Sequence, residues 1–302
     1  MTDFALDRRA LARSFNLAAP HYDSAALLQQ RASGELLDRL QYFTLAPQRI
    51  LDLGAGTCQG AQALQRRYPR AQVLAMDLAE GMLRAMPRPR WRWSRPWLWR
   101  RDTIARVCAD AYALPLADQG VDIIYSNLML QWCDQPDGVF SEIARVLRPG
   151  GLLVFSSFGP DTLGELRGAW AAADPYSHVS LFADMPQLAQ GLTRAGLAEP
   201  VMDVEHYRQY YPDAHALMHE LKRLGARNAA RDRARGLTGR SRMQQMLRAY
   251  EALRTPRGLP ATYEVIFGAA FGGARASPAH ARGALPPGEF AVPVGAIKRG
   301  QR

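Results

Sequence analysis

Two short segments in the first third of the chain constrain its fold more than any other feature. Residues 50–58 read Ile-Leu-Asp-Leu-Gly-Ala-Gly-Thr-Cys, which predicts a buried strand, a glycine turn and the start of a helix. Residues 73–77 predict a second strand, which ends in Asp77, 21 residues after Gly56. Glycines let a ligand approach the backbone closely, and an acid at the tip of the next strand can accept hydrogen bonds from both hydroxyls of a ribose. The two segments together predict a nucleoside-binding site.

The rest of the chain continues the same alternation of apolar strands and helices. Strands are expected over residues 49–53, 72–77, 106–109, 121–126, 151–157, 201–210 and 261–267. Apolar strands that alternate with helices are typical of a parallel sheet covered on both faces, so the fold class is α/β. Helical stretches at 213–225 and 241–254 separate the last two strands, which would otherwise be neighbours. We therefore interpret residues 213–254 as an inserted helical cap.

This pattern divides the chain into three parts. Residues 1–46 are expected to form an amino-terminal helical lid, since residues 6–46 have helical apolar spacing. Residues 47–272 form the main domain, with the cap and an unusual insertion at 87–106. Residues 273–302 are rich in Gly, Ala, Pro and Arg, and we expect this tail to be disordered.

Composition and charge exclude several classes of protein. The formal charge of +10 is concentrated in residues 88–106 and 273–302, so a basic face for nucleic acid is not expected on the globular part. No stretch of about 18 apolar residues predicts a membrane span, and residues 1–9 lack the apolar core of a signal peptide. The three cysteines have no metal-ligand spacing and fit a reducing cytoplasm, where we expect the protein to act without a metal.

The insertion at 87–106 contains four of the six tryptophans, interleaved with arginines. Such a sequence can bind a membrane, nucleic acid or an acidic partner. It can equally be a loop of this lineage that packs on the domain, and Pro87, Pro89 and Pro96 argue against a regular amphipathic helix. Both interpretations stay open, and an acidic carrier protein is the partner that the first of them favours.

Three further segments, together with the glycine turn, form a pattern that resembles a known family. Asp110 and Ala111 follow the third strand, residues 126–132 (Ser-Asn-Leu-Met-Leu-Gln-Trp) follow the fourth, and residues 148–151 (Arg-Pro-Gly-Gly) precede the fifth. The set resembles the class I S-adenosylmethionine-dependent methyltransferases, over about residues 45–160. The resemblance implies a Rossmann-like sheet of strand order 3-2-1-4-5-7-6, with strand seven antiparallel. Cys58 departs from the pattern, because a third glycine is usual there.

The resemblance also implies which residues hold the cofactor, S-adenosyl-L-methionine. The residues expected to bind it are Asp52, Gly54, Ala55, Gly56, Asp77, Leu78, Met82, Asp110, Ala111, Asn127, Gln131 and Trp132. For Trp132, packing in the core is an equal alternative.

A more specific resemblance extends over residues 13–270. It depends on residues 15–23 (Phe-Asn-Leu-Ala-Ala-Pro-His-Tyr-Asp), 158–167 (Phe-Gly-Pro-Asp-Thr-Leu-Gly-Glu-Leu-Arg), 182–185 (Phe-Ala-Asp-Met) and 259–265 (Leu-Pro-Ala-Thr-Tyr-Glu-Val). These segments are similar to the malonyl-[acyl-carrier protein] O-methyltransferase family of biotin synthesis. The family implies methylation of the free malonyl carboxylate on acyl-carrier protein. A carboxylate is already ionised at pH 7, so this chemistry needs alignment and desolvation rather than a general base.

The residues that hold the carboxylate are less clearly indicated. Tyr22 lies in the lid and His178 in the insertion after the fifth strand, and we expect both to be catalytic. Tyr22 can also be a packing aromatic, and His178 a structural or surface residue. Arg167, Lys222 and Arg223 are expected to contact substrate or the acidic carrier, unless they form only a solvated face.

Three other functions remain possible on the sequence. The acceptor can be another small carboxylic acid. A nucleic-acid methyltransferase is disfavoured, because residues 126–129 lack the usual Asn or Asp-Pro-Pro-aromatic motif and Cys133 lacks a preceding proline. A methyltransferase fold that acts as a non-enzymatic assembly factor is disfavoured by Gly54, Gly56, Asp77 and Asp110.

Overall fold

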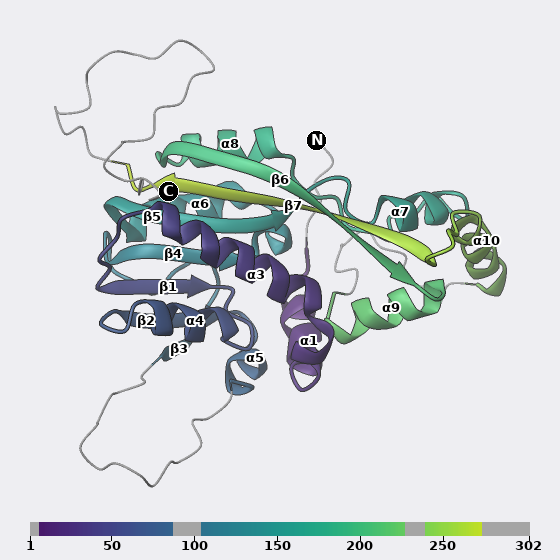
Figure 1. The fold of residues 1–302 in the computed structure, drawn as a ribbon, viewed down its shortest axis with the longest axis horizontal. Helices are drawn as coiled ribbons and strands as arrows, with labels where there is room; N and C mark the ends of the chain where they lie inside the picture. Colours follow the sequence, from purple (N-terminus) through teal and green to yellow (C-terminus); the bar gives the residue numbers. More distant parts are fainter. Residues whose placement is uncertain (1–5, 87–103, 227–238, 274–302) are drawn as a thin grey trace, which may run out of the picture.

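A seven-stranded sheet forms the centre of the protein (Figure 1). The computed structural model describes residues 6–86, 104–226 and 239–273, and all structural statements concern these ranges. The strands are β1 (Arg49–Leu53), β2 (Gln72–Asp77), β3 (Ala105–Cys108), β4 (Val121–Asn127), β5 (Leu147–Phe158), β6 (Ala198–Tyr211) and β7 (Leu259–Phe271). Their order in the sheet is β3-β2-β1-β4-β5-β7-β6, which confirms the predicted order. The first five are parallel, and β7 runs antiparallel to both of its neighbours.

Both faces of this sheet are buried, because successive apolar residues of each central strand point to opposite sides. Ile50 and Ile123 pack with α3 (Leu27–Arg39) and α4 (Gln59–Arg67) on one face. Leu51 and Ile124 pack with α6 (Pro136–Val146) and α8 (Met185–Arg194) on the other. The predicted two-sided α/β packing is therefore confirmed. The helices cover the two faces of the sheet and leave the polar residues at the ends of the strands available for a site.

The amino-terminal segment is helical, but it is not one continuous helix. It consists of α1 (Arg8–Ala18), α2 (Tyr22–Ala25), α3 and a short 3-10 turn, η1 (Leu40–Tyr42). The Asp7 carboxylate caps α1 by accepting a hydrogen bond from the Ala10 N–H. A turn at residues 19–21, which includes Pro20, separates α1 from α2. This break matters for the site, because Tyr22, the first residue of the short helix α2, lines the cavities described below.

The last two strands extend past the rest of the sheet and carry three helices at their far end (Figure 1). Helices α9 (Ala214–Arg223) and α10 (Arg240–Glu251) lie between β6 and β7 in the chain, at the place predicted for the inserted cap. Helix α10 packs against α7 (Gly164–Ala171), and α9 packs against α2 and β6. Helix α5 (Glu80–Arg84) lies beside β2 and β3 and packs against α1.

The strands differ from the predicted ones mainly at their ends. β5 begins at Leu147 rather than at residue 151, because the glycines after Pro149 pair with the end of β7. The Gly150 N–H donates to the Gly272 carbonyl, and the Gly272 N–H donates to the Gly151 carbonyl. Residues 87–103 of the predicted insertion at 87–106 lie outside the described residues. The predicted tail also lies outside them from residue 274 onward. Within the described ranges, no helix has the length and apolar character needed to cross a membrane.

Candidate active site

A cavity lies at the carboxyl ends of β1, β2 and β4, beneath α1. Parallel sheets bind ligands at this edge. Its lining includes many of the residues predicted to hold the cofactor: Gly54, Gly56, Asp77, Leu78, Met82, Asp110, Ala111, Asn127 and Trp132. We call this the first cavity.

The glycine turn after β1 forms the floor of the first cavity. Gly54 has a φ of 77° and Gly56 a φ of 53°, a backbone region that glycine adopts most easily. A Cβ atom on Gly54 would lie 2.3 Å from the Cγ of Met129, whereas the space beside Gly56 is open for 4 Å. The turn is therefore tightly packed on one side and accessible to a ligand on the other. Cys58, which departs from the usual glycine, has a left-handed φ of 66° and occupies the N-cap position of α4, fully buried and without a capping hydrogen bond from its side chain.

Asp77 stands at the end of β2 and joins the glycine turn. One carboxylate oxygen accepts a hydrogen bond from the Gly56 N–H at 2.8 Å, and the other accepts one from the Ala79 N–H at 2.8 Å. Burial raises the pKa of Asp77, while these backbone hydrogen bonds oppose the rise. An ionised carboxylate has about four lone-pair sites, so Asp77 retains acceptors for two ligand hydroxyls.

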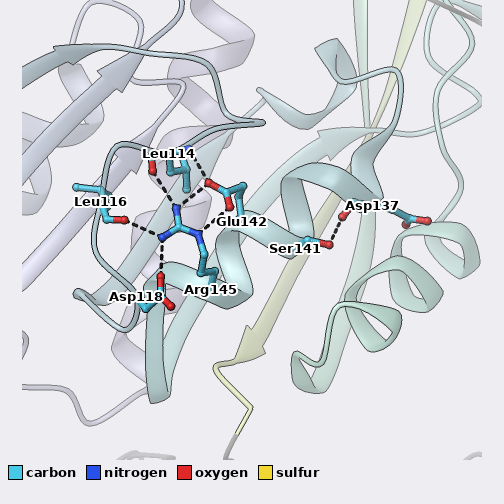
Figure 2. Close-up of polar contacts among 7 residues, drawn as sticks. All are labelled: Leu114, Leu116, Asp118, Asp137, Ser141, Glu142 and Arg145. Carbon is cyan, nitrogen blue, oxygen red and sulfur yellow. Dashed lines mark hydrogen bonds and ion pairs between the residues drawn. The ribbon is translucent and has the colours of Figure 1, made fainter.

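The loop after β3 carries Asp110 to the opposite wall of the first cavity. Figure 2 shows how this loop is anchored: the Arg145 guanidinium of α6 donates to the carbonyls of Leu114 and Leu116 and pairs with Asp118 and Glu142. The Glu142 carboxylate also accepts from the Leu114 N–H at 2.7 Å. A half-buried arginine thus anchors residues 114–118, the part of this loop that follows Asp110.

Asp110 is also contacted by the amino-terminal helix, which sequence reasoning missed. Arg8 of α1 pairs with the Asp110 carboxylate at 2.8 Å and lies over the Tyr112 ring. Arg8, Phe15, Tyr112 and Met129 all line the first cavity. Nothing in the local sequence marks Arg8, because it stands far from the strand motifs in the chain.

A smaller third cavity adjoins the glycine turn on the side of α2 and α3. It contains Asp52 and Ala55, together with Asp23, Thr57 and Tyr125. Asp52 is 2% exposed, and its Oδ2 has no hydrogen-bond partner among the described residues. Burial raises the pKa of Asp52 to about 7. A buried polar atom without a partner is costly, so this oxygen is a candidate contact for a ligand.

A second cavity lies between the sheet edge, the loop before α8 and the cap. Gln131, His178, Glu220, Leu221 and Leu224 line it. It shares four residues with the first cavity: Phe15, Tyr22, Leu128 and Trp132. The edge-on contact between Phe15 and Trp132, with ring centroids 5.3 Å apart, lies at this boundary. The site therefore consists of two adjoining chambers with an apolar junction.

Comparison with known proteins agrees with this arrangement. Residues 51–155 match the family model described as a methyltransferase domain. The chain is 45% identical over 285 residues to the malonyl-[acyl-carrier protein] O-methyltransferase of Methylovorus sp. (strain MP688), covering 94% of each chain. It is 43% identical over 272 residues to the enzyme of that name from Gallionella capsiferriformans (strain ES-2), covering 90% of this chain and 93% of the relative.

The chain belongs to the malonyl-[acyl-carrier protein] O-methyltransferase family. The predicted family is thus confirmed. The YcgJ protein from Bacillus subtilis shares the fold, with a TM-score of 0.55 and 17% identity, over 81% of this chain and 99% of its own.

The O-methyltransferase places Tyr22 at the centre of its site, since the residue lines all three cavities. Burial, reinforced by the charges of Asp77 and Asp23, raises the pKa of Tyr22 above its usual value. The hydroxyl therefore keeps its proton and is available as a hydrogen-bond donor. His178 lines the second cavity but not the first, and Gln131 does the same, with its Nε2 donating to the Leu128 carbonyl at 2.6 Å.

The three predicted cations lie around the O-methyltransferase's second cavity rather than in its wall. The Nη2 of Arg167 donates to the carbonyls of Pro160 and Thr162, so this guanidinium holds the turn that positions Thr162. Lys222 and Arg223 are exposed in the last turn of α9. Their contacts with substrate or carrier, like the roles of Tyr22 and His178, stay predictions.

Proposed function

We propose that this protein transfers a methyl group from S-adenosyl-L-methionine to the free carboxylate of a malonyl group carried on acyl-carrier protein. The product would be the malonyl methyl ester that starts biotin-precursor synthesis, with S-adenosyl-L-homocysteine released. The family membership supports the proposal. The observation that carries it is that the first and second cavities adjoin and share four lining residues, so that a cofactor in the first would lie next to an acceptor in the second.

The residues of the first cavity fit the proposed cofactor. Asp77 would accept from the ribose hydroxyls, Asp110 from the adenine edge, and Leu78, Met82 and Trp132 would enclose the base. The open space beside Gly56 permits close approach of the ligand to the backbone. The orphaned oxygen of Asp52 in the third cavity suits a cationic or N–H-bearing end of the cofactor. When bound, S-adenosyl-L-methionine supplies its methyl group as part of a positively charged sulfonium.

The junction residues would promote the reaction by exclusion of water and by alignment. The rings of Phe15 and Trp132 and the side chain of Leu128 make it apolar. A carboxylate that attacks a sulfonium methyl in water must lose hydration, so an apolar junction that orients it removes much of that barrier. The Tyr22 O–H would donate to the acceptor carboxylate and hold it in line. Oxygen gains the methyl while sulfur keeps the bonding electrons, so no general base is required.

The cap gives a route for a carrier protein. Leu221 of α9 and Leu224, just after this helix, line the second cavity, while Lys222 and Arg223 lie exposed between them in the sequence. The Arg223 guanidinium donates to the Ser24 hydroxyl of α2 at 2.7 Å, where cap and lid meet. An acidic carrier bound to these cations would bring its thioester arm to the chamber wall formed by the same helix.

Transfer of a labelled methyl group tests the proposal. The purified protein is incubated with S-adenosylmethionine labelled in its methyl group and with malonyl-carrier protein, malonyl-coenzyme A, unacylated carrier or bulk RNA. We expect a base-labile methyl ester on malonyl-carrier protein. Absence of label from malonyl acceptors, with cofactor binding intact, would show that the acceptor is a different acid, and label on RNA alone would overturn the proposed reaction.

A further inference from the structure

A buried carboxylate behind the second cavity has no role in the chemistry so far. Asp174 lies just after α7, with 3% of its side chain exposed. Its Oδ1 lies 2.9 Å from the Nε2 of His178 and accepts a hydrogen bond from the Tyr176 N–H at 3.0 Å. Its Oδ2 lies 4.0 Å from the Nη1 of Arg242 on α10. Asp174 thus links the cap to the histidine of the chamber.

The histidine ring is fixed from a second direction. It stacks on Trp170 of α7, with the ring centroids 3.7 Å apart and the planes 10° from parallel. Trp170 is itself only 7% exposed, so the stack cannot shift without disturbing the packing of α7. Because Nε2 meets Asp174 and the ring lines the second cavity, Nδ1 is the nitrogen left for a ligand.

The protonation state decides what Nδ1 can bind. A neutral imidazole that donates a hydrogen bond from its Nε2–H to Asp174 has a lone pair on Nδ1, and this lone pair repels a carboxylate. An imidazolium has an N–H there, which attracts one. Among the described residues that line the second cavity, Glu220 is the other charged side chain, since burial raises the pKa of the Tyr22 and Tyr263 phenols and keeps them neutral. With His178 neutral, this lining carries a net negative charge and is unfavourable to an anionic substrate.

We propose that Asp174 is a positioning residue that orients His178 and pairs with its imidazolium form, so that the Nδ1–H of the ring holds the substrate carboxylate. This inference rests on the proposed function and extends it to the origin of carboxylate selectivity. Hydrogen bonds from His178 and Tyr176 outweigh the effect of burial and lower the pKa of Asp174, so the carboxylate stays charged. A second consequence concerns the product: a methyl ester has no charge to pair with the imidazolium, so it binds more weakly than the acid.

The test is the pH dependence of the Michaelis constant for malonyl-carrier protein, at saturating cofactor, from about pH 5.5 to pH 8.5. Wild-type KM should rise with pH, because a neutral imidazole presents a lone pair at Nδ1 where the imidazolium presents an N–H. Asp174→Asn keeps the shape of the side chain and its ability to accept from Nε2–H but removes the charge. This variant should raise KM about tenfold at pH 7 and move the rise to lower pH, with cofactor affinity unchanged.

Two further variants make the result decisive. His178→Gln should give a high KM that no longer depends on pH over this range. Asp161→Asn is the matched control, because Asp161 also lies near a histidine, His206 at 3.4 Å, but neither residue lines the second cavity. It should behave as the wild type.

If the wild type methylates malonyl-carrier protein while Asp174→Asn has an unchanged KM profile, the inference is wrong and the proposed function stands. If the wild type methylates no malonyl acceptor, the proposed function fails first.

Discussion

The first and second cavities share a wall but are built in different ways. The first is formed mainly by strand ends and the turns that follow them, so most of its polar residues come from short motifs in residues 50–132, while the lid adds Arg8 and Tyr22. The second is assembled from α2, the turn after β5, the loop before α8, and α9 of the cap. Its wall residues are far apart in the chain and are brought together by the packing of the cap on the lid. The Ser14 hydroxyl, which donates to the Gly225 carbonyl, is one of these lid-to-cap contacts.

The difference explains how one fold can keep a cofactor and vary an acceptor. A site at the ends of parallel strands is fixed by the sheet itself, since register and hydrogen bonding place each tip. A chamber between inserted helices depends on side-chain packing, which can change without disturbing the sheet. Variants in the two regions should therefore separate cofactor binding from acceptor binding, and the following predictions test that separation.

The largest effect is expected for Asp77→Ala in the first cavity. Loss of two acceptors for ribose hydroxyls should weaken S-adenosylmethionine binding between tenfold and a hundredfold, or about 1.4 to 2.8 kcal/mol. Isothermal titration calorimetry measures the affinity directly. Because Asp77 does not line the second cavity, KM for the acceptor at saturating cofactor should stay near that of the wild type. Unchanged cofactor affinity would remove Asp77 from the ribose site.

Asp52→Asn should change stability in a pH-dependent way. Burial raises the pKa of Asp52 to about 7 in the folded protein, whereas an unfolded aspartate titrates near 4. Between these values the folded state binds more protons, so the free energy of unfolding falls as pH rises through this window and is lowest above pH 7. The asparagine variant lacks this penalty, which is at most about 4 kcal/mol at pH 8, but it leaves a buried amide N–H without a partner. The variant should therefore be more stable than the wild type by roughly 2 kcal/mol at pH 8.

Urea denaturation at pH 5 and pH 8 checks this expectation. Asp122→Asn is the matched control, because Asp122 is also buried but accepts from the N–H groups of Gln48 and Arg49 and pairs with Arg148. That variant should lose stability at pH 8. A wild-type curve that is flat between pH 5 and pH 8 would count against the raised pKa of Asp52. A stabilised Asp52→Asn with weaker cofactor binding would show that the site keeps a strained acid for function.

These contrasts also show what the sequence could predict. The glycine turn, Asp77 and Asp110 could be placed because each follows an apolar strand, and parallel strands bring their ends to one edge. Arg8 and Tyr112 could not, since the first reaches Asp110 from a helix 102 residues away in the chain. The contact between Asp174 and His178 could not be predicted either, because it depends on the turn after α7, and the neighbouring Arg242 comes from α10, whose packing no local pattern specifies. The ends of β5 and β7 were missed because their extra pairing is tertiary.

Tyr22→Phe tests the residue that belongs to both chambers. Removal of the hydroxyl takes away a hydrogen-bond donor to the acceptor carboxylate, so turnover should fall about tenfold, or about 1.4 kcal/mol. The ring that packs at the junction is kept, and cofactor affinity should change less than twofold. Single-turnover kinetics with saturating cofactor isolate the chemical step. Wild-type rates would leave Tyr22 as a packing residue, whereas equal losses in cofactor affinity and turnover would assign it to the first chamber.

The smallest effect is expected for the double variant Lys222→Ala/Arg223→Ala on the cap. Exposed charge pairs are screened and worth about 0.2 to 1 kcal/mol, so KM for malonyl-carrier protein should rise a few-fold at low salt and differ little at high salt. KM for a malonyl thioester of free pantetheine should not change, since that acceptor lacks the acidic protein.

Arg66→Ala/Arg70→Ala, which removes two exposed cations beside α4, is the control for net charge. If both double variants raise KM equally, the carrier responds to overall charge and not to the surface of α9. If only the cap variant does, the second chamber is paired with a docking surface on the same helix, and the separation from the cofactor chamber extends to the partner.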